Sequence, residues 1–216
     1  MSLTADQVRE AIAGIDGSIR WPGPIDVSRA MPAGVVVPLL LTGEPRVALV
    51  LRSAHLDDHA AEVGFPGGKP DPSDADLRAT ALRELGEETG VTADQVTWLG
   101  ILSACPVITG RFLIHPFVAA LSADAAPHVA SSEIARVIEL PIEPLITGET
   151  PTYGVESEYQ GVRILAPHFR LDGCVLYGAS AYIFYELLAR IAAHTGRSLP
   201  VPRLEAVPPW GNRYRR

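Results

Sequence analysis

The sequence predicts a mixed α/β (α+β) protein that folds as one domain. Apolar runs of strand length alternate along the chain with two segments of helical periodicity, residues 74–89 and 178–194. A chain of 216 residues, 47% of them hydrophobic and 20% charged, is long enough to bury a core of ordinary size. We therefore expect a single domain over 1–216, in which 1–30 forms an N-terminal helix and connector and 200–216 forms a tail.

The first part of the chain predicts a short helix followed by a β-hairpin. Thr4 and Gln7 have the spacing of a capping box, which begins a helix expected over residues 4–15. After a connector that contains several prolines, residues 34–41 and 46–52 are apolar enough to be strands. The Gly-Glu-Pro sequence between them is typical of a turn, so the two strands are expected to form a hairpin.

A long loop and a strong helix come next. Residues 53–73 have little periodicity and are rich in Gly, Pro, Asp and His, which predicts a loop. Loops of this length inside a compact domain are commonly functional. The helix is expected over 74–89, because Asp74 can cap its start and Gly90 stands where a glycine ends many helices.

The second half of the chain predicts more strands and a final helix. Strands are expected at 96–102, 112–121 and 134–140, and a further pair within 153–171. The last helix, 178–194, is expected to turn Ile183, Leu187 and Ile191 toward the core.

Composition and charge exclude several classes of protein. A formal net charge of −7 argues against a general nucleic-acid binder. No apolar run approaches the ~20 residues that span a membrane, and the first residues lack the pattern of a signal peptide. Cys105 and Cys174 are too few and too far apart for a disulfide framework, so we expect inert thiols and a cytoplasmic location.

Three carboxylates, Glu84, Glu87 and Glu88, lie one turn apart in the expected helix. Like charges at this spacing weaken a helix unless a cation compensates them, and Mg²⁺ and Mn²⁺ prefer oxygen ligands. The spacing alone supports a metal site and a solvated acidic face beside Arg83 equally well. The loop that precedes the helix favours the metal site, because its glycines let the backbone approach a phosphate: Gly64-Phe65-Pro66-Gly67-Gly68-Lys69.

Gly68 and the acidic segment together resemble the Nudix box, G-x5-E-x7-R-E-U-x-E-E-x-G-U, in which U is aliphatic. The C-terminal half of the box matches at every specified position: Arg83-Glu84-Leu85-Gly86-Glu87-Glu88-Thr89-Gly90-Val91. The N-terminal half departs from the pattern. Asp74 stands where the first glutamate is expected, with one extra residue before Arg83, so either Asp74 or Asp76 takes its place.

The loop before the box resembles the signature of the coenzyme A pyrophosphatase subfamily of Nudix hydrolases. The matching residues are Arg52, Ser53, Leu56, His59, Val63 and Phe65 through Gly68. Other segments similar to that subfamily are Asp71-Pro72-Ser73-Asp74, Thr80-Ala81-Leu82-Arg83-Glu84, Glu133-Ile134-Ala135 and Tyr177-Gly178-Ala179-Ser180-Ala181. Three positions depart from it: Ala61-Glu62 replaces Gly-Gln, Leu51 replaces Thr and Met31 replaces Arg.

The resemblance implies a fold and a reaction. The fold would be a mixed β-sheet sandwiched between α-helices. The reaction would be Mg²⁺- or Mn²⁺-dependent hydrolysis of coenzyme A or an acyl derivative to 3′,5′-ADP and 4′-phosphopantetheine. One alternative is a pyrophosphatase of ADP-ribose or another nucleotide sugar. A second is a Nudix-fold binding or regulatory module without turnover, against which the intact acidic set argues. Family analogy adds a homodimer.

The resemblance also implies roles for individual residues. Glu84 and Glu88 would be the main metal ligands, Glu87 a ligand or the base for water, and Arg83 a partner that orients a box carboxylate. Glu133 is a candidate distal base or ligand, although an ordinary surface glutamate is an equal interpretation. The substrate-binding set would be Arg52, Ser53, His59 and Phe65, with the backbone of Gly67 and Gly68.

Residues outside these motifs have plainer interpretations. The remaining histidines have no ligand spacing and are expected to be structural or solvated: His55, His115, His128, His168 and His194. The basic tail is expected to be disordered, with closure over a site or a dimer contact as alternatives; its arginines are Arg203, Arg213, Arg215 and Arg216.

Overall fold

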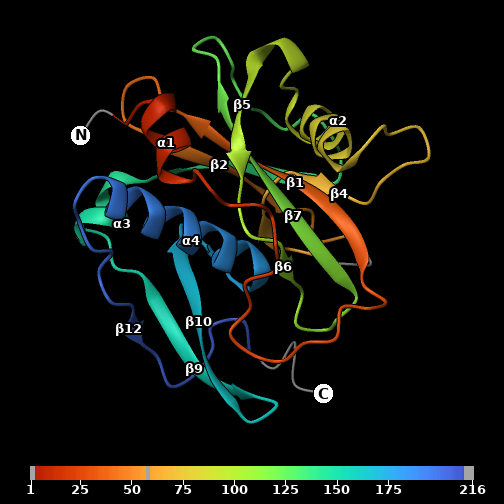
Figure 1. Ribbon diagram of the computed structural model, residues 1–216. Helices are drawn as coiled ribbons and strands as arrows, with labels where there is room; N and C mark the ends of the chain where they lie inside the picture. The colour runs from red at the N-terminus through yellow and green to blue at the C-terminus, as the bar shows by residue number, and fades with distance from the viewer. Residues whose placement is uncertain (1–2, 57–58, 212–216) are drawn as a thin grey trace.

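The computed structural model describes residues 3–56 and 59–211 and contains a large and a small β-sheet (Figure 1). Its described helices are α1 (Ala5–Ala11), α2 (Leu77–Thr89), α3 (Glu143–Thr147) and α4 (Gly178–His194), with a 3-10 turn, η1 (Ala93–Gln95). Its described strands are β1 (Met31–Leu40), β2 (Arg46–Arg52), β3 (Val63–Gly64), β4 (Gly67–Gly68), β5 (Val96–Ile101), β6 (Cys105–Pro106), β7 (Phe112–Leu121), β8 (Ile134–Pro141), β9 (Tyr153–Tyr159), β10 (Val162–Leu171), β11 (Cys174–Leu176) and β12 (Arg203–Leu204).

The large sheet is mixed, and β1 lies at its centre. The order along it is β3-β2-β1-β7-β5, with β8 on β2, β6 on β7 and β4 on β1. β1 runs parallel to β7 along its whole length and antiparallel to β2, which confirms the expected hairpin. β1 begins at Met31, three residues before the predicted start at 34, because its first residues already pair with Phe112 and its neighbours.

Helices cover both faces of the large sheet (Figure 1). On one face α2 packs on β1, where Val36, Ala81 and Leu85 belong to one apolar cluster. On the other face α1 and α4 share a larger cluster with other side chains of β1 and β2 and with the small sheet. The alternation of β1 side chains between the two clusters follows from the pleat of a strand. The predicted mixed sheet between helices is confirmed.

Helix α2 begins at Leu77, so the prediction of a start at 74 is wrong. Asp76 is the N-cap, and its carboxylate accepts the N–H of Ala79 at 2.8 Å. Asp74 lies one turn upstream in a loop, where its carboxylate accepts the Asp71 N–H at 2.8 Å. The other end agrees with expectation, because Gly90 ends the helix with a left-handed φ of 71°.

Helix α4 has the predicted bounds, and Ile183, Leu187 and Ile191 are fully buried as expected. The N-terminal helix also forms, with Thr4 and Gln7 in the predicted capping box, although it ends before residue 15. None of the helices among residues 3–56 and 59–211 combines the length and apolarity that a membrane span requires.

The small sheet has the order β11-β10-β9-β12. Strands β9 and β10 are the pair expected within 153–171. β12 was not predicted, and it corrects the expectation of a disordered tail for Arg203: the Arg203 N–H donates to the carbonyl of Thr152 at 2.9 Å. This two-residue strand has no periodicity and forms by pairing with β9. Arg213, Arg215 and Arg216 lie outside the described residues.

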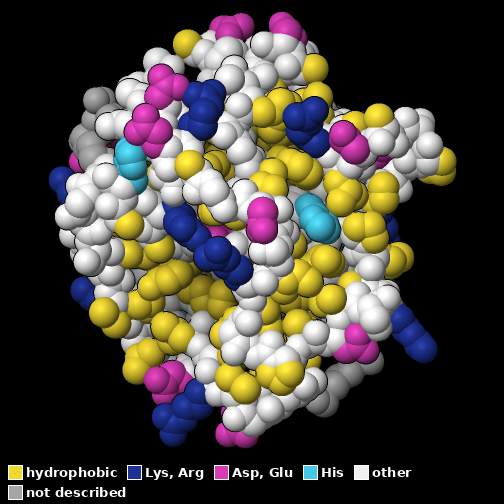
Figure 2. All heavy atoms as spheres, in the orientation of Figure 1, with side chains coloured by type: hydrophobic (Ala, Val, Ile, Leu, Met, Phe, Trp, Pro, Cys, Tyr) yellow, Lys and Arg dark blue, Asp and Glu magenta, His cyan; other side chains and the backbone are white. Residues whose placement is uncertain are grey.

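Charged side chains are mixed on the surface. On the face in Figure 2, Lys and Arg are interspersed with Asp and Glu and form no continuous basic patch. Charges of both signs therefore share that face, in a chain whose formal net charge is −7.

Candidate metal and pyrophosphate site

Helix α2 can approach the sheet closely because glycines face it. A Cβ on Gly34 of β1 would lie 2.2 Å from the carbonyl oxygen of Leu77, and one on Gly68 would lie 2.4 Å from Oε1 of Glu84. Gly67 has a φ of 153°, and a Cβ there would lie 2.4 Å from the carbonyl oxygen of Gly34. Helix α2, which carries the acidic residues, therefore packs directly against the backbone of Gly67 and Gly68.

Glu88 is the buried member of the acidic set, with 5% of its surface exposed. One carboxylate oxygen accepts the Gly67 N–H at 3.2 Å, and the other lies 3.5 Å from Nη1 of Arg52. Burial raises the pKa of Glu88 to about 7; the charge of Glu84 adds to this effect, whereas the Gly67 N–H and Arg52 oppose it. The protein thus leaves part of this negative charge uncompensated.

Arg83 binds the carboxylates on the outer side of α2. Its Nε and Nη2 donate to the two oxygens of Asp74, each at 3.1 Å, and its Nη1 lies 3.1 Å from Glu84 and 3.0 Å from Glu87. The Arg83 guanidinium holds the pKa of Asp74 down to about 2. Of the two aspartates expected at the first acidic position of the box, Asp74 contacts Arg83, whereas Asp76 caps the helix.

Pairing between β2 and β8 brings Glu133 to the site. Arg52, the last residue of β2, pairs with Ile134, and its Nη2 lies 3.2 Å from the Glu133 carboxylate. The Glu133 side chain is 56% exposed, so it can reach a bound molecule. Ser53 fixes this corner, because its N–H donates to the Glu133 carbonyl at 2.7 Å and its hydroxyl donates to the Ser132 carbonyl at 2.8 Å.

The structure revises the roles expected of Ser53 and Phe65. Ser53 is buried, with its hydroxyl bonded inside the protein. Phe65 is also buried and packs edge-on against Phe184 of α4, with 6.5 Å between ring centroids. Both side chains therefore stabilise the loop from its buried side. His59 is half-exposed instead, and its Nδ1 lies 2.7 Å from the carboxylate of Glu62.

Sequence reasoning missed the partners of Glu62. Its carboxylate also accepts the hydroxyl of Tyr177 at 3.0 Å. The two residues are far apart in the chain, so only the subfamily departure at Glu62 marked the position in advance.

The donor set has the chemistry of a site for a hard divalent cation. Within the described ranges, no three Asp, Glu, His or Cys side chains already converge as a ligand cluster. Arg83 holds Glu84 and Glu87, while Gly67 and Arg52 hold Glu88. Burial raises the pKa of Glu84 as well as that of Glu88, so a cation would relieve a charge that these contacts leave in place. Carboxylate oxygens are the ligands that Mg²⁺ and Mn²⁺ prefer.

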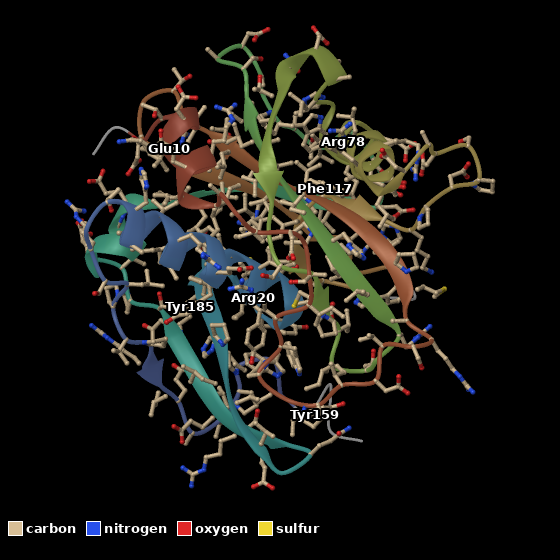
Figure 3. All side chains as sticks on the ribbon, in the orientation of Figure 1. Glu10, Arg20, Arg78, Phe117, Tyr159 and Tyr185 are labelled. Atoms are coloured by element: carbon tan, nitrogen blue, oxygen red, sulfur yellow. The ribbon has the colours of Figure 1, made fainter. Side chains whose placement is uncertain are left out.

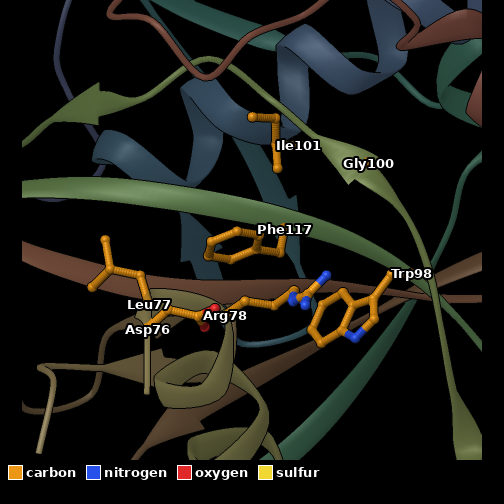
Figure 4. Close-up of a pocket in the computed structure, with 7 residues that line it drawn as sticks. All are labelled: Asp76, Leu77, Arg78, Trp98, Gly100, Ile101 and Phe117. Atoms are coloured by element: carbon orange, nitrogen blue, oxygen red, sulfur yellow. The ribbon is translucent and has the colours of Figure 1, made fainter. Parts of the chain in front are cut away.

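Two cavities of the described structure lie elsewhere. One of about 510 Å³ sits beside the start of α2, where Arg78 lies over the ring of Trp98 at 5.9 Å and Phe117 forms a wall (Figure 4). Another of about 220 Å³ lies between the N-terminal connector and α4, and Arg20 and Tyr185, labelled in Figure 3, line it. Neither cavity is lined by Glu84, Glu87 or Glu88. The candidate site is therefore identified from its charged groups and not from a cavity.

The sequence model of the NUDIX domain matches residues 31–156. Among similar proteins, one from Enterobacter sp. (strain 638) is 36% identical over 117 residues, which is 54% of this chain and 60% of that protein. One from Photorhabdus laumondii is 30% identical over 159 residues, or 74% of this chain and 84% of that protein. Both are described as uncharacterized Nudix hydrolase NudL.

Two similar solved structures have lower sequence identity. A MutT protein from Methanosarcina mazei has a TM-score of 0.49 and 17% identity, covering 78% of this chain and 96% of that one. The NUDIX domain of Shewanella oneidensis NrtR, complexed with ADP ribose, has a TM-score of 0.42 and 21% identity, covering 55% of this chain and 77% of that one. The domain match spans more than half of the chain. The chain belongs to the Nudix family.

Proposed function

We propose that this protein is a metal-dependent Nudix hydrolase that cleaves the pyrophosphate bond of a nucleoside diphosphate derivative. The observation that carries the proposal is the packing of Glu84 and Glu88, one turn apart, against the backbone of Gly67 and Gly68. This arrangement puts hard oxygen donors beside a loop that a phosphate can approach.

Glu84 and Glu88 would hold the cation, with Glu87 as a further ligand or as the base that takes a proton from water. A bound Mg²⁺ or Mn²⁺ neutralises the pyrophosphate and acidifies a water molecule. Arg83 orients the carboxylates through its contacts with Glu84 and Glu87. The backbone of Gly67 and Gly68 borders the space in which the diphosphate would lie.

The cationic side of the site would receive the substrate. Arg52 and His59 are the basic residues of the loop end, and an anionic substrate needs such local charge because the net charge of the protein is −7. Glu133 pairs with Arg52 and is exposed, and both features support the proposal that it acts as a second base or ligand.

Coenzyme A or an acyl derivative is the proposed substrate, because the loop over residues 51–68 resembles the coenzyme A pyrophosphatase signature. ADP-ribose or another nucleotide sugar is the alternative that the Ala61-Glu62 departure keeps open. A binding or regulatory module without turnover is the third, and the complete acidic set argues against it. We further propose a cytoplasmic homodimer, on the cysteine content and on family analogy.

A substrate panel tests the proposal. The full chain is incubated with Mg²⁺ or Mn²⁺ and either coenzyme A or ADP-ribose, and the products are identified by mass, with EDTA as the control. We expect 3′,5′-ADP and 4′-phosphopantetheine, and no products with EDTA. Turnover of ADP-ribose alone would support the nucleotide-sugar alternative. Binding of both compounds without turnover would support the module.

A further inference from the structure

The turn at residues 59–62 has a backbone that its side chains disfavour. His59 has a φ of 58° and Ala61 a φ of 56°, both in the left-handed region that residues with a Cβ rarely adopt. Ala61 stands where the subfamily signature has glycine, the residue that adopts this conformation most readily. Strained conformations of this kind persist only where neighbouring contacts hold them.

Glu62 supplies those contacts. Its carboxylate lies 2.7 Å from Nδ1 of His59 and accepts the Tyr177 hydroxyl at 3.0 Å. Its backbone N–H donates to the His59 carbonyl at 3.2 Å, and its carbonyl accepts the Arg52 N–H at 2.9 Å. One residue therefore closes the turn on itself and joins it both to the end of β2 and to the start of α4.

Tyr177 is in turn held by the C-terminal segment, residues 203–211. Its ring stacks on Trp210 with 5.1 Å between centroids and an interplanar angle of 14°. Trp210 also meets the buried His168 edge-on at 5.4 Å, and His168 lies 3.0 Å from Glu205. The C-terminal segment thus reaches the loop beside the acidic site through a continuous series of contacts.

We propose that Glu62 is a positioning residue of the candidate site, and that Tyr177 and Trp210 keep its carboxylate in place. The inference rests on the proposed function. The turn is bonded to the backbone of Arg52, whose guanidinium contacts Glu88 and Glu133. Loosening the turn moves both of its basic side chains, Arg52 and His59, relative to an anionic substrate. The carboxylate of Glu62, which stands where the signature has the amide of a glutamine, therefore binds His59 and Tyr177 of the protein itself.

The test compares two tyrosines that each lose one hydroxyl. Tyr177→Phe removes the bond to Glu62 and keeps the ring against Trp210. Tyr153→Phe is the matched control, since Tyr153 stacks on His168 at 5.6 Å in the same aromatic group. For Tyr177→Phe we expect faster amide hydrogen exchange at residues 59–64 and a KM raised about three- to tenfold with kcat little changed, as the loss of one hydrogen bond gives. The control should change neither.

A second substitution that relieves the backbone strain of the turn separates that strain from other effects of Tyr177→Phe. Ala61→Gly in the Tyr177→Phe background should restore slow exchange and a low KM, because glycine holds a φ near 56° without help. Native exchange at 59–64 in Tyr177→Phe would overturn the proposal, and so would faster exchange with an unchanged KM. Exchange is measured without substrate. A wild-type protein that hydrolyses nothing would instead contradict the proposed function.

Discussion

At the scale of single residues, the site is a balance between carboxylates and two arginines. Arg83 contacts Asp74 in the preceding loop and the outer carboxylates of α2, and Arg52 contacts the buried Glu88. The two arginines do not cancel the effect of burial, because the pKa of Glu84 is raised despite Arg83 and that of Glu88 is raised to about 7 despite Arg52. Removing the carboxylate of Glu88 should therefore affect hydrolysis, whereas removing the carboxylate of Asp74, the partner of Arg83, should affect stability.

Glu88→Gln should abolish most of the metal-dependent hydrolysis while leaving the fold intact. The amide can still accept the Gly67 N–H but is a poor ligand for a hard cation, so kcat should fall by about a hundredfold or more. Steady-state rates with Mg²⁺ test this, with thermal unfolding as the control. Unchanged hydrolysis in this variant would refute the ligand assignment.

Asp74→Asn should make the free energy of unfolding depend less steeply on pH in the acidic range. Arg83 lowers the pKa of Asp74 from 3.8 to about 2, so its carboxylate is more acidic in the folded chain. The stability that it contributes is complete above pH 4 and is lost as the pH falls toward 2. Urea unfolding of both proteins across that range should show the steeper loss in the wild type. Parallel curves would mean that the Arg83–Asp74 pair does not stabilise the fold.

At the scale of elements, long patterned segments could be predicted and short paired ones could not. β2, β7 and α4 have the predicted bounds because each buries a continuous apolar pattern. α2 starts late because Asp74 and Asp76 are both good caps and only the contact with Arg83 decides between them. β3, β4 and β12 form by tertiary pairing, which no local pattern records.

The same distinction applies to the site. The acidic residues and Gly67-Gly68 could be found from spacing, because they come from one loop and one helix. The contact between Glu62 and Tyr177 could not, since it joins residues 115 positions apart.

Alanine substitutions at Gly67 and Gly68 should differ in their effects on stability and on hydrolysis. Gly67→Ala would place a Cβ 2.4 Å from a backbone oxygen of β1, so the free energy of unfolding should fall by roughly 2–4 kcal/mol. In Gly68→Ala the atoms nearest the new Cβ are those at the end of the Glu84 side chain, which can turn aside. This substitution should lower hydrolysis more than it lowers stability. Denaturant unfolding and kcat for both variants test this, and equal stability losses would contradict it.

At the scale of the whole molecule, α2 lies on one face of the large sheet while α4 and the small sheet lie on the other. Glu88 belongs to the helix that closes the smaller apolar cluster, so a cation bound at its carboxylate would stabilise the folded chain as a whole. Binding to the native state alone adds about 2.7 kcal/mol at a hundred times the Kd.

Mn²⁺ should therefore raise the unfolding temperature of the wild type by about 5–10 °C at saturating concentration. Glu84→Gln and Glu88→Gln should lose most of this shift, and EDTA should reverse it. Differential scanning calorimetry with and without Mn²⁺ gives the measurement. A shift of equal size in both variants would place the cation at another site.

The pairing of β12 with β9 also has a consequence for handling the protein. Strand β9 carries a row of backbone groups on the side away from β10, and Arg203–Leu204 covers its beginning. A chain cut back to residue 200 would expose that edge to strands of other molecules, the usual route to edge-to-edge aggregation. Truncation should therefore cost solubility before it costs secondary structure.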